Sequence, residues 1–156
     1  MEVIFIMDYD LLKQKIIVIL DDKKQKGLQE IIDLLYHSAD HYDWIGIYIV
    51  KNNYLHLGPW QGKQATEHTK IPIGIGVCGS AVKTGKTEYV PDVHADERYL
   101  SCFLSTKSEI VVPIKKDEYI IGEIDIDSNK LDAFTQDDVI FLESIADMLS
   151  EHIYNL

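Results

Sequence analysis

Acidic side chains alternate along one predicted strand in the last third of the chain. Glu123, Asp125 and Asp127 are spaced by two, with Ile124 and Ile126 between them. Side chains two apart point to the same face of a strand, so the three carboxyl groups share a face opposite the isoleucines. Carboxylates are poor strand residues and repel one another along a face. The pattern indicates either a solvated face of an acidic protein or a site for a cationic group.

A further acid, Glu109, lies on the preceding predicted strand. If the two strands pair, Glu109 converges with Asp125 and Asp127. Crowded carboxyl groups raise one another's pKa, so one of them can stay protonated at neutral pH and act as an acid. The residues alone leave the solvated face and the functional cluster open as alternatives.

Two aromatic residues flank a glycine on another predicted strand, residues 44–50. Trp44, Gly46 and Tyr48 share one face, and isoleucines occupy the other. The isoleucine face is the natural core. The aromatic face either leaves room for a small ligand between the rings or packs against a neighbouring strand, with Gly46 admitting a close approach.

Cys78 lies in a glycine-rich segment, Gly74–Ser80, that leads into a predicted helix. Free N–H groups at a helix start suit an anion such as a carboxylate, and the same position lowers the pKa of a thiol. The spacing does not match a phosphate-binding loop, because no Gly-Lys-Ser/Thr follows. The alternative is a turn followed by a small buried thiol.

The second cysteine, Cys102, falls in a predicted loop over residues 92–106, where a thiol is more accessible than in a core strand. The first residues do not have the pattern of a signal peptide, so we expect a cytoplasmic, reducing environment, without a lasting structural disulfide. In such an environment the two thiols are either inert core residues or reactive groups. A metal site is not expected, because the sequence has no CxxC motif or paired histidines.

The remaining pattern predicts the elements that position these residues. Helices are expected at 9–20, 24–37 and 77–84 and from a capping box at Thr135 and Asp138 onward, and strands at 44–50, 54–57, 88–90, 109–114 and 119–127. Residues 58–62 break the strand pattern. Short connections between strands imply an antiparallel sheet with the terminal helices covering one face, an α+β fold.

The composition narrows the classes of function. With 156 residues the chain has the size of one domain. Its formal net charge of −11 repels phosphate backbones and anionic lipid, so neither nucleic acid nor a membrane surface is expected as a partner. No apolar run approaches the roughly 20 residues that span a bilayer.

Six motifs occur in an order that resembles the free methionine-(R)-sulfoxide reductase family, over roughly residues 8–155. They are Trp44-Ile-Gly-Ile-Tyr48, Leu57-Gly-Pro-Trp-Gln-Gly62, Ile71-Pro-Ile-Gly-Ile-Gly-Val-Cys-Gly79, Pro91-Asp-Val-His94, Lys107-Ser-Glu-Ile-Val-Val-Pro113 and Gly122-Glu-Ile-Asp-Ile-Asp-Ser128. The resemblance implies a single GAF domain over residues 1–156, with 1–7 as a loosely ordered extension. It also implies a central antiparallel sheet, with the terminal helices on one face and the ligand-site loops on the other.

The same resemblance implies the reaction and its residues. Free L-methionine (R)-sulfoxide is reduced to methionine, with Cys102 as the catalytic cysteine and Cys78 as the resolving one. No prosthetic cofactor is implied, and an external dithiol, thioredoxin, restores the enzyme. A homodimer is expected. The implied substrate-site residues are the acids Glu109, Asp125 and Asp127, the aromatics Trp44 and Tyr48 around the methyl end, and the N–H groups from Val77 to Gly79 for the carboxylate; Asp125 and Glu109 also act in catalysis.

The sequence departs from the family pattern in three places. Residues 65–70 lack a third cysteine that many members carry, Phe103 stands where an Asp is usual, and Glu123 replaces an apolar residue. The alternative function is a non-catalytic GAF module that binds a small molecule or senses redox state.

Overall fold

The computed structural model describes residues 6–22, 27–101 and 103–153. Its helices are α1 (Tyr9–Asp21), α2 (Gly27–Ser38), α3 (Gly76–Thr84), α4 (Gln136–Ile153) and the short 3-10 helix η1 (Val93–Ala95). Its strands are β1 (Trp44–Lys51), β2 (Tyr54–Gly62), β3 (Lys70–Pro72), β4 (Glu88–Val90), β5 (Ser108–Lys116) and β6 (Tyr119–Ser128).

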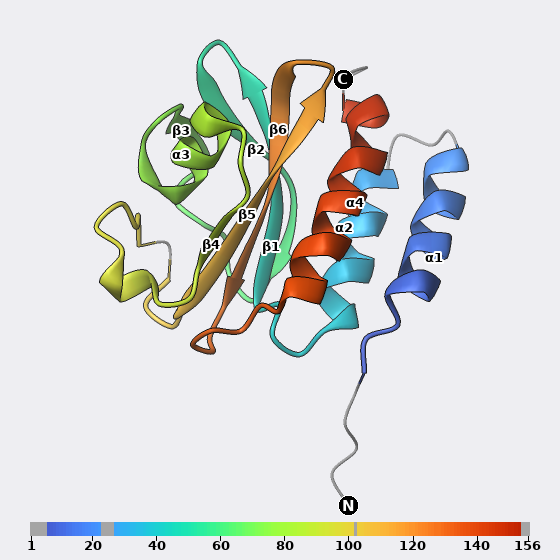
Figure 1. Ribbon diagram of the computed structural model, residues 1–156, viewed down its shortest axis with the longest axis horizontal. Helices are drawn as coiled ribbons and strands as arrows, with labels where there is room; N and C mark the ends of the chain where they lie inside the picture. The colour runs from blue at the N-terminus through green and yellow to red at the C-terminus, as the bar shows by residue number, and fades with distance from the viewer. Residues whose placement is uncertain (1–5, 23–26, 102, 154–156) are drawn as a thin grey trace, which may run out of the picture.

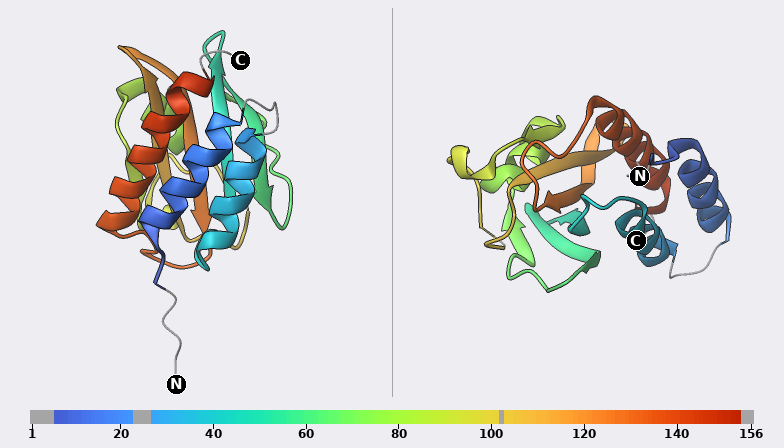
Figure 2. Two further views of the ribbon diagram at one scale, coloured as in Figure 1. Left: turned by 90° about the vertical axis from the view of Figure 1, so that its right-hand side faces the viewer. Right: turned by 90° about the horizontal axis from the view of Figure 1, so that it is seen from below.

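The strands form one antiparallel sheet in the order β3-β2-β1-β6-β5-β4. Figure 1 shows α1, α2 and α4 on one face of this sheet, while α3 and the segment that follows β4 lie on the other. The views in Figure 2 show the same separation from the side and from below. The predicted α+β fold, with terminal helices on one face and loops on the other, is confirmed.

Each face of the sheet carries its own buried cluster. On the helix side, Ile45, Ile47, Ile124 and Ile126 are fully buried against α2 and α4. On the other side, apolar side chains from β1, β2, β3, α3 and the loop before β5 pack together. The isoleucine face is the core, as the alternation predicts, but the opposite face is also closed to water.

The capping box at the start of α4 is present. The Thr135 amide donates to Asp138 Oδ2 at 2.9 Å, and the Asp138 amide donates to Thr135 Oγ1 at 3.2 Å. The hydroxyl of Tyr42 also donates to the buried Asp138 carboxylate, at 3.0 Å. This cap therefore ties the start of α4 to the segment that leads into β1.

The interruption expected at residues 58–62 is wrong, because β2 continues through them to Gly62. Gly46 pairs with Trp60 and Tyr48 pairs with Leu57, so two residues of β2, Gly58 and Pro59, oppose one residue of β1. This is a β-bulge, which accommodates glycine and proline without ending a strand. The short strand β3, also not predicted, pairs with β2.

Candidate active site

The four acids converge on the face of the sheet opposite the helices. Strand register places Glu109 beside Asp127, and Glu123 precedes Asp125 by two residues on the same face of β6. All are buried, with exposed fractions of 6% for Glu109, 0% for Glu123 and 2% for both Asp125 and Asp127. The solvated-face interpretation is therefore wrong, and the predicted convergence is confirmed. We refer to these four residues as the acid cluster.

Gly46 is required where β1 crosses the acid cluster. It pairs with Asp125, and a Cβ built at Gly46 would lie 2.4 Å from Cη2 of the Trp44 indole. Trp44 in turn stacks on Trp60, with ring centroids 6.2 Å apart. The space above the glycine is thus filled by the indole of Trp44, and it is not an open gap between two rings.

Burial shifts the acidity of the whole cluster. It is the main reason that the pKa values of Glu109, Glu123 and Asp127 lie well above their usual range, and the negative charge of Asp125 raises them further. Burial also raises the pKa of Asp125, to about 6. Glu109, Glu123 and Asp127 are therefore protonated at neutral pH. Crowding predicts such protonation, but desolvation raises these pKa values more than mutual repulsion does.

Cys78, in the first turn of α3, faces the acid cluster. Its Sγ lies 3.8 Å from Glu109 Oε1, and its side chain is buried. Burial raises the pKa of this thiol well above its usual value, and the charges of Asp125, Glu123 and Glu109 raise it further. The lowered pKa expected at a helix start is therefore wrong, because desolvation and nearby acids outweigh the helix dipole.

The backbone amides at the start of α3, which the sequence predicts as donors to a carboxylate, are not equivalent in the structure. The Gly79 amide donates to the Ile75 carbonyl at 3.0 Å, so it belongs to the helix ladder. The amide of Val77 comes before Gly79, the first residue whose amide donates within the helix, as at any helix start. Gly79 has a packing role instead: a Cβ there would lie 2.7 Å from the carbonyl oxygen of Pro72.

A small cavity of about 10 Å³ joins most of the predicted residues. It is lined by Tyr48, His68, Ile71, Val77, Cys78, Leu100, Glu109 and Asp125. Trp44 and Asp127 line a neighbouring depression of about 80 Å³, together with Phe103. Cys102 lies outside the described residues, so its predicted role stays a prediction.

His68 and Leu100 are lining residues that the sequence did not indicate. The Tyr48 hydroxyl donates to the His68 carbonyl at 2.7 Å, and the His68 ring contacts the Ser101 carbonyl at 3.3 Å. These contacts join the segment before β3 to the loop that precedes β5. No signal in the irregular segment 65–70 could have identified His68, because its position depends on this tertiary contact.

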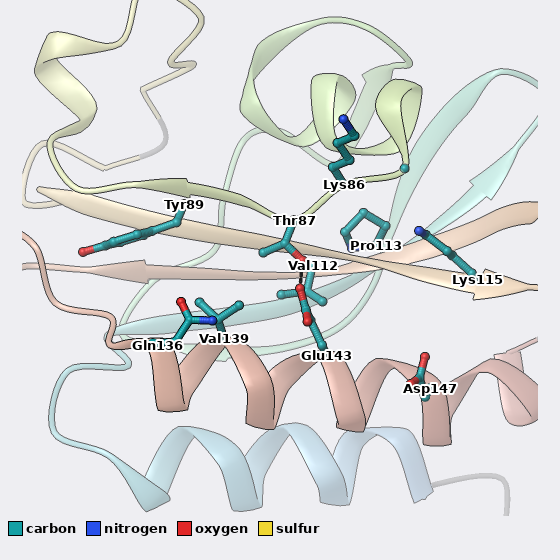
Figure 3. Close-up of a pocket in the computed structure, with 11 residues that line it drawn as sticks. Lys86, Thr87, Tyr89, Val112, Pro113, Lys115, Gln136, Val139, Glu143 and Asp147 are labelled. Carbon is teal, nitrogen blue, oxygen red and sulfur yellow. Dashed lines mark hydrogen bonds between the residues drawn. The ribbon is translucent and has the colours of Figure 1, made fainter.

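A larger hollow of about 620 Å³ lies elsewhere, between the β4–β5 edge of the sheet and α4. Figure 3 shows residues that line it, among them Thr87, whose hydroxyl donates a hydrogen bond to Glu143 of α4. None of the predicted site residues lines it. The volume of a hollow is therefore not what identifies the candidate site in this protein.

Comparisons with known proteins agree on one family. The family model for the GAF domain matches residues 25–153. The free methionine-R-sulfoxide reductase of Saccharomyces cerevisiae is 39% identical over 133 residues, covering 80% of this chain and 73% of that protein. The reductase of Staphylococcus aureus, solved in complex with its substrate, superimposes with a TM-score of 0.85 at 39% identity, covering 95% of this chain and 97% of that one.

The reduced form of the same Staphylococcus aureus protein gives a TM-score of 0.88 at 39% identity, over 98% of this chain and 99% of that one. The likeness thus extends over nearly the whole length of both chains. Among the described residues, no helix combines the length and apolar character needed to cross a bilayer.

Proposed function

The chain belongs to the GAF-domain family and, within it, to the free methionine-R-sulfoxide reductases, and we propose that it reduces free L-methionine (R)-sulfoxide to L-methionine. The observation that carries this proposal is the junction of Cys78 with the buried acids Glu109 and Asp125 in one cavity. The Staphylococcus aureus protein, which shares this fold, was solved with its substrate.

The site offers one partner for each part of a free amino acid. Asp125, whose pKa of about 6 leaves it mainly ionised at neutral pH, attracts the ammonium group, and the carboxyl oxygens of Glu109 and Asp127 accept hydrogen bonds from it. The first amides of α3, including that of Val77, point a partial positive charge at the substrate carboxylate. Trp44 and Tyr48 enclose the methyl end. A peptide-bound sulfoxide lacks both free termini, so the same arrangement selects the free amino acid.

Substrate entry requires movement of the side chains that close the site. A cavity of about 10 Å³ has room for a single water-sized body. Leu100 lines this cavity and Phe103 lines the neighbouring depression. Displacement of these two side chains would merge the spaces into one that reaches from Cys78 to Trp44.

The proposed chemistry uses both thiols. The Cys102 thiolate attacks the sulfoxide sulfur while the protonated carboxyl group of Glu109, which burial and the negative charge of Asp125 keep protonated, donates a proton to the sulfoxide oxygen. Methionine leaves, and Cys102 holds the oxygen as a sulfenic acid. The Cys78 thiol then condenses with it, releasing water and forming a disulfide. An external dithiol such as thioredoxin is oxidised as it returns both cysteines to thiols.

The environment of Cys78 suits the second role. Its raised pKa keeps the thiol protonated at neutral pH, so it does not compete with Cys102 for the sulfoxide.

The scheme uses no prosthetic group. We also place the protein in the cytoplasm, where thioredoxin keeps thiols reduced, and propose a homodimer formed through the terminal helices, where α1 exposes Leu11, Ile17 and Val18.

A thioredoxin-coupled turnover assay tests the proposal. NADPH consumption is measured with free (R)-sulfoxide, free (S)-sulfoxide and a peptide containing methionine sulfoxide. Turnover is expected only with the free (R) epimer. Binding of the free sulfoxide without consumption of reductant would contradict the proposal and favour a non-catalytic sensing module.

A further inference from the structure

One sulfur and two carboxylate oxygens, all able to bind a metal ion, lie close together at the cavity. Cys78 Sγ, one oxygen of Glu109 and one of Asp125 all lie within 4.8 Å of one another. The three side chains are at least nine-tenths buried. Glu109 Oε2 and Asp125 Oδ1 have no hydrogen-bond partner among the described residues. Buried polar atoms in this state require compensation, by a proton or by a bound group.

The cavity matches a single ion in size and position. Its volume of about 10 Å³ suits one water-sized body, and all three donor residues line it. Ligand atoms around tetrahedral zinc lie roughly 3.3–3.8 Å apart. The 3.8 Å between Cys78 Sγ and Glu109 Oε1 falls at the edge of this range, and small side-chain rotations bring the wider separations into it.

The donor set favours a borderline metal over a hard one. Magnesium and calcium prefer six or more oxygen ligands, whereas a thiolate with carboxylate oxygens suits zinc. Among the described residues that line the cavity, His68 is the single basic one, so none of them is a lysine or arginine that competes for the carboxylates.

We propose that this cavity binds a divalent metal ion of the zinc class through Cys78, Glu109 and Asp125, and that the bound ion excludes free methionine sulfoxide. The metal replaces the protons of the Cys78 thiol and of the Glu109 carboxyl group, both of which pass to solvent, and water completes the coordination. The exclusion of substrate rests on the function proposed above, whereas the metal site does not. Zinc here is a reversible inhibitor that holds the reduced enzyme inactive, not a resident cofactor.

Cobalt(II) is the probe, because a bond between cobalt and a thiolate gives a charge-transfer absorption. The full reduced chain is titrated with Co²⁺, followed by Zn²⁺, which should displace it. The chain has only two cysteines, so the Cys102→Ser variant retains Cys78 as its only thiol. We expect the cobalt–thiolate band to persist in Cys102→Ser and to disappear in Cys78→Ser.

The acids are tested in the same way. Glu109→Gln and Asp125→Asn should each weaken metal binding by more than about 10-fold. Glu143→Gln, an acid of the hollow in Figure 3, is the matched control and should bind as the wild type does. Circular dichroism spectra that match the wild type identify the variants that fold.

The outcomes separate this proposal from the proposed function. Absence of the band in Cys102→Ser, wild-type metal affinity in Cys78→Ser, or displacement by Mg²⁺ as readily as by Zn²⁺ would overturn the metal site. A band that is unaffected by saturating free methionine (R)-sulfoxide would overturn the exclusion. If metal-free protein shows the band on titration but no turnover, the reductase assignment fails while the metal site stands.

Discussion

The two faces of the β1–β6–β5 sheet are both buried but serve different purposes. Ile124 and Ile126 on the helix side meet apolar partners and leave no polar atom to satisfy. Glu123, Asp125 and Asp127 alternate with them on the same strand and point to the opposite face. There, both Glu123 oxygens and Asp125 Oδ1 have no hydrogen-bond partner in the part of the chain that the structure describes. Burial on the first face contributes to stability, whereas burial on the second costs stability and creates acids that hold protons at neutral pH.

Removal of the predicted nucleophile should have the largest effect. Cys102→Ser is expected to abolish methionine release in a single-turnover assay. The remaining thiol, Cys78, stays protonated at neutral pH because its pKa is raised. Cys78→Ser should release one equivalent of methionine but fail to turn over with thioredoxin. Methionine release by Cys102→Ser would show that the nucleophile is misassigned.

Neutral replacement of a residue in the acid cluster should have the second-largest effect on activity. Asp125→Asn or Glu109→Gln should lower kcat/KM by roughly 10²–10⁴-fold, the usual contribution of a positioned proton donor. Thermal unfolding should stay within a few degrees of the wild type, because the amides fill the same space. Unchanged kinetics in both variants would make these acids structural.

The opposite face should respond in the reverse way. Ile126→Ala, adjacent to Asp125, removes a fully buried side chain from the helix-side core. The free energy of unfolding should fall by about 2–5 kcal/mol, as measured by denaturant titration. The remaining folded enzyme should keep its kcat, and a large fall in kcat with intact stability would contradict the division between the faces.

The pH dependence of stability should show the smallest effect. Burial raises the pKa of Asp125 from 3.8 to about 6 in the folded state. The folded protein therefore binds more protons than the unfolded chain in this window, so its stability is full below pH 4 and declines as pH rises through about 6. The contribution of Asp125 is about 1–3 kcal/mol, so Asp125→Asn should reduce the slope in urea titrations at several pH values, while the raised pKa values of Glu109, Glu123 and Asp127 maintain the remainder.

Most of the framework follows from local sequence patterns. The alternation in residues 123–127 correctly predicts which side chains share a face, and Thr135 with Asp138 correctly predicts the start of α4. The bulge at Gly58 and Pro59 was missed because glycine and proline end an isolated strand pattern, and only pairing with β1 accommodates them. His68 was missed because tertiary contacts, not the pattern of its segment, place it at the cavity.

Residue types and their periodicity are enough to assign the two faces of each strand. The closure of the second face to water, and the position of Cys78 among carboxyl groups, depend on how distant segments of the chain pack together. Periodicity is a local property of the backbone, but burial and electrostatic shifts depend on segments far apart in the chain. The raised pKa of Cys78, opposite to that expected from its helix position, is the clearest result of this difference.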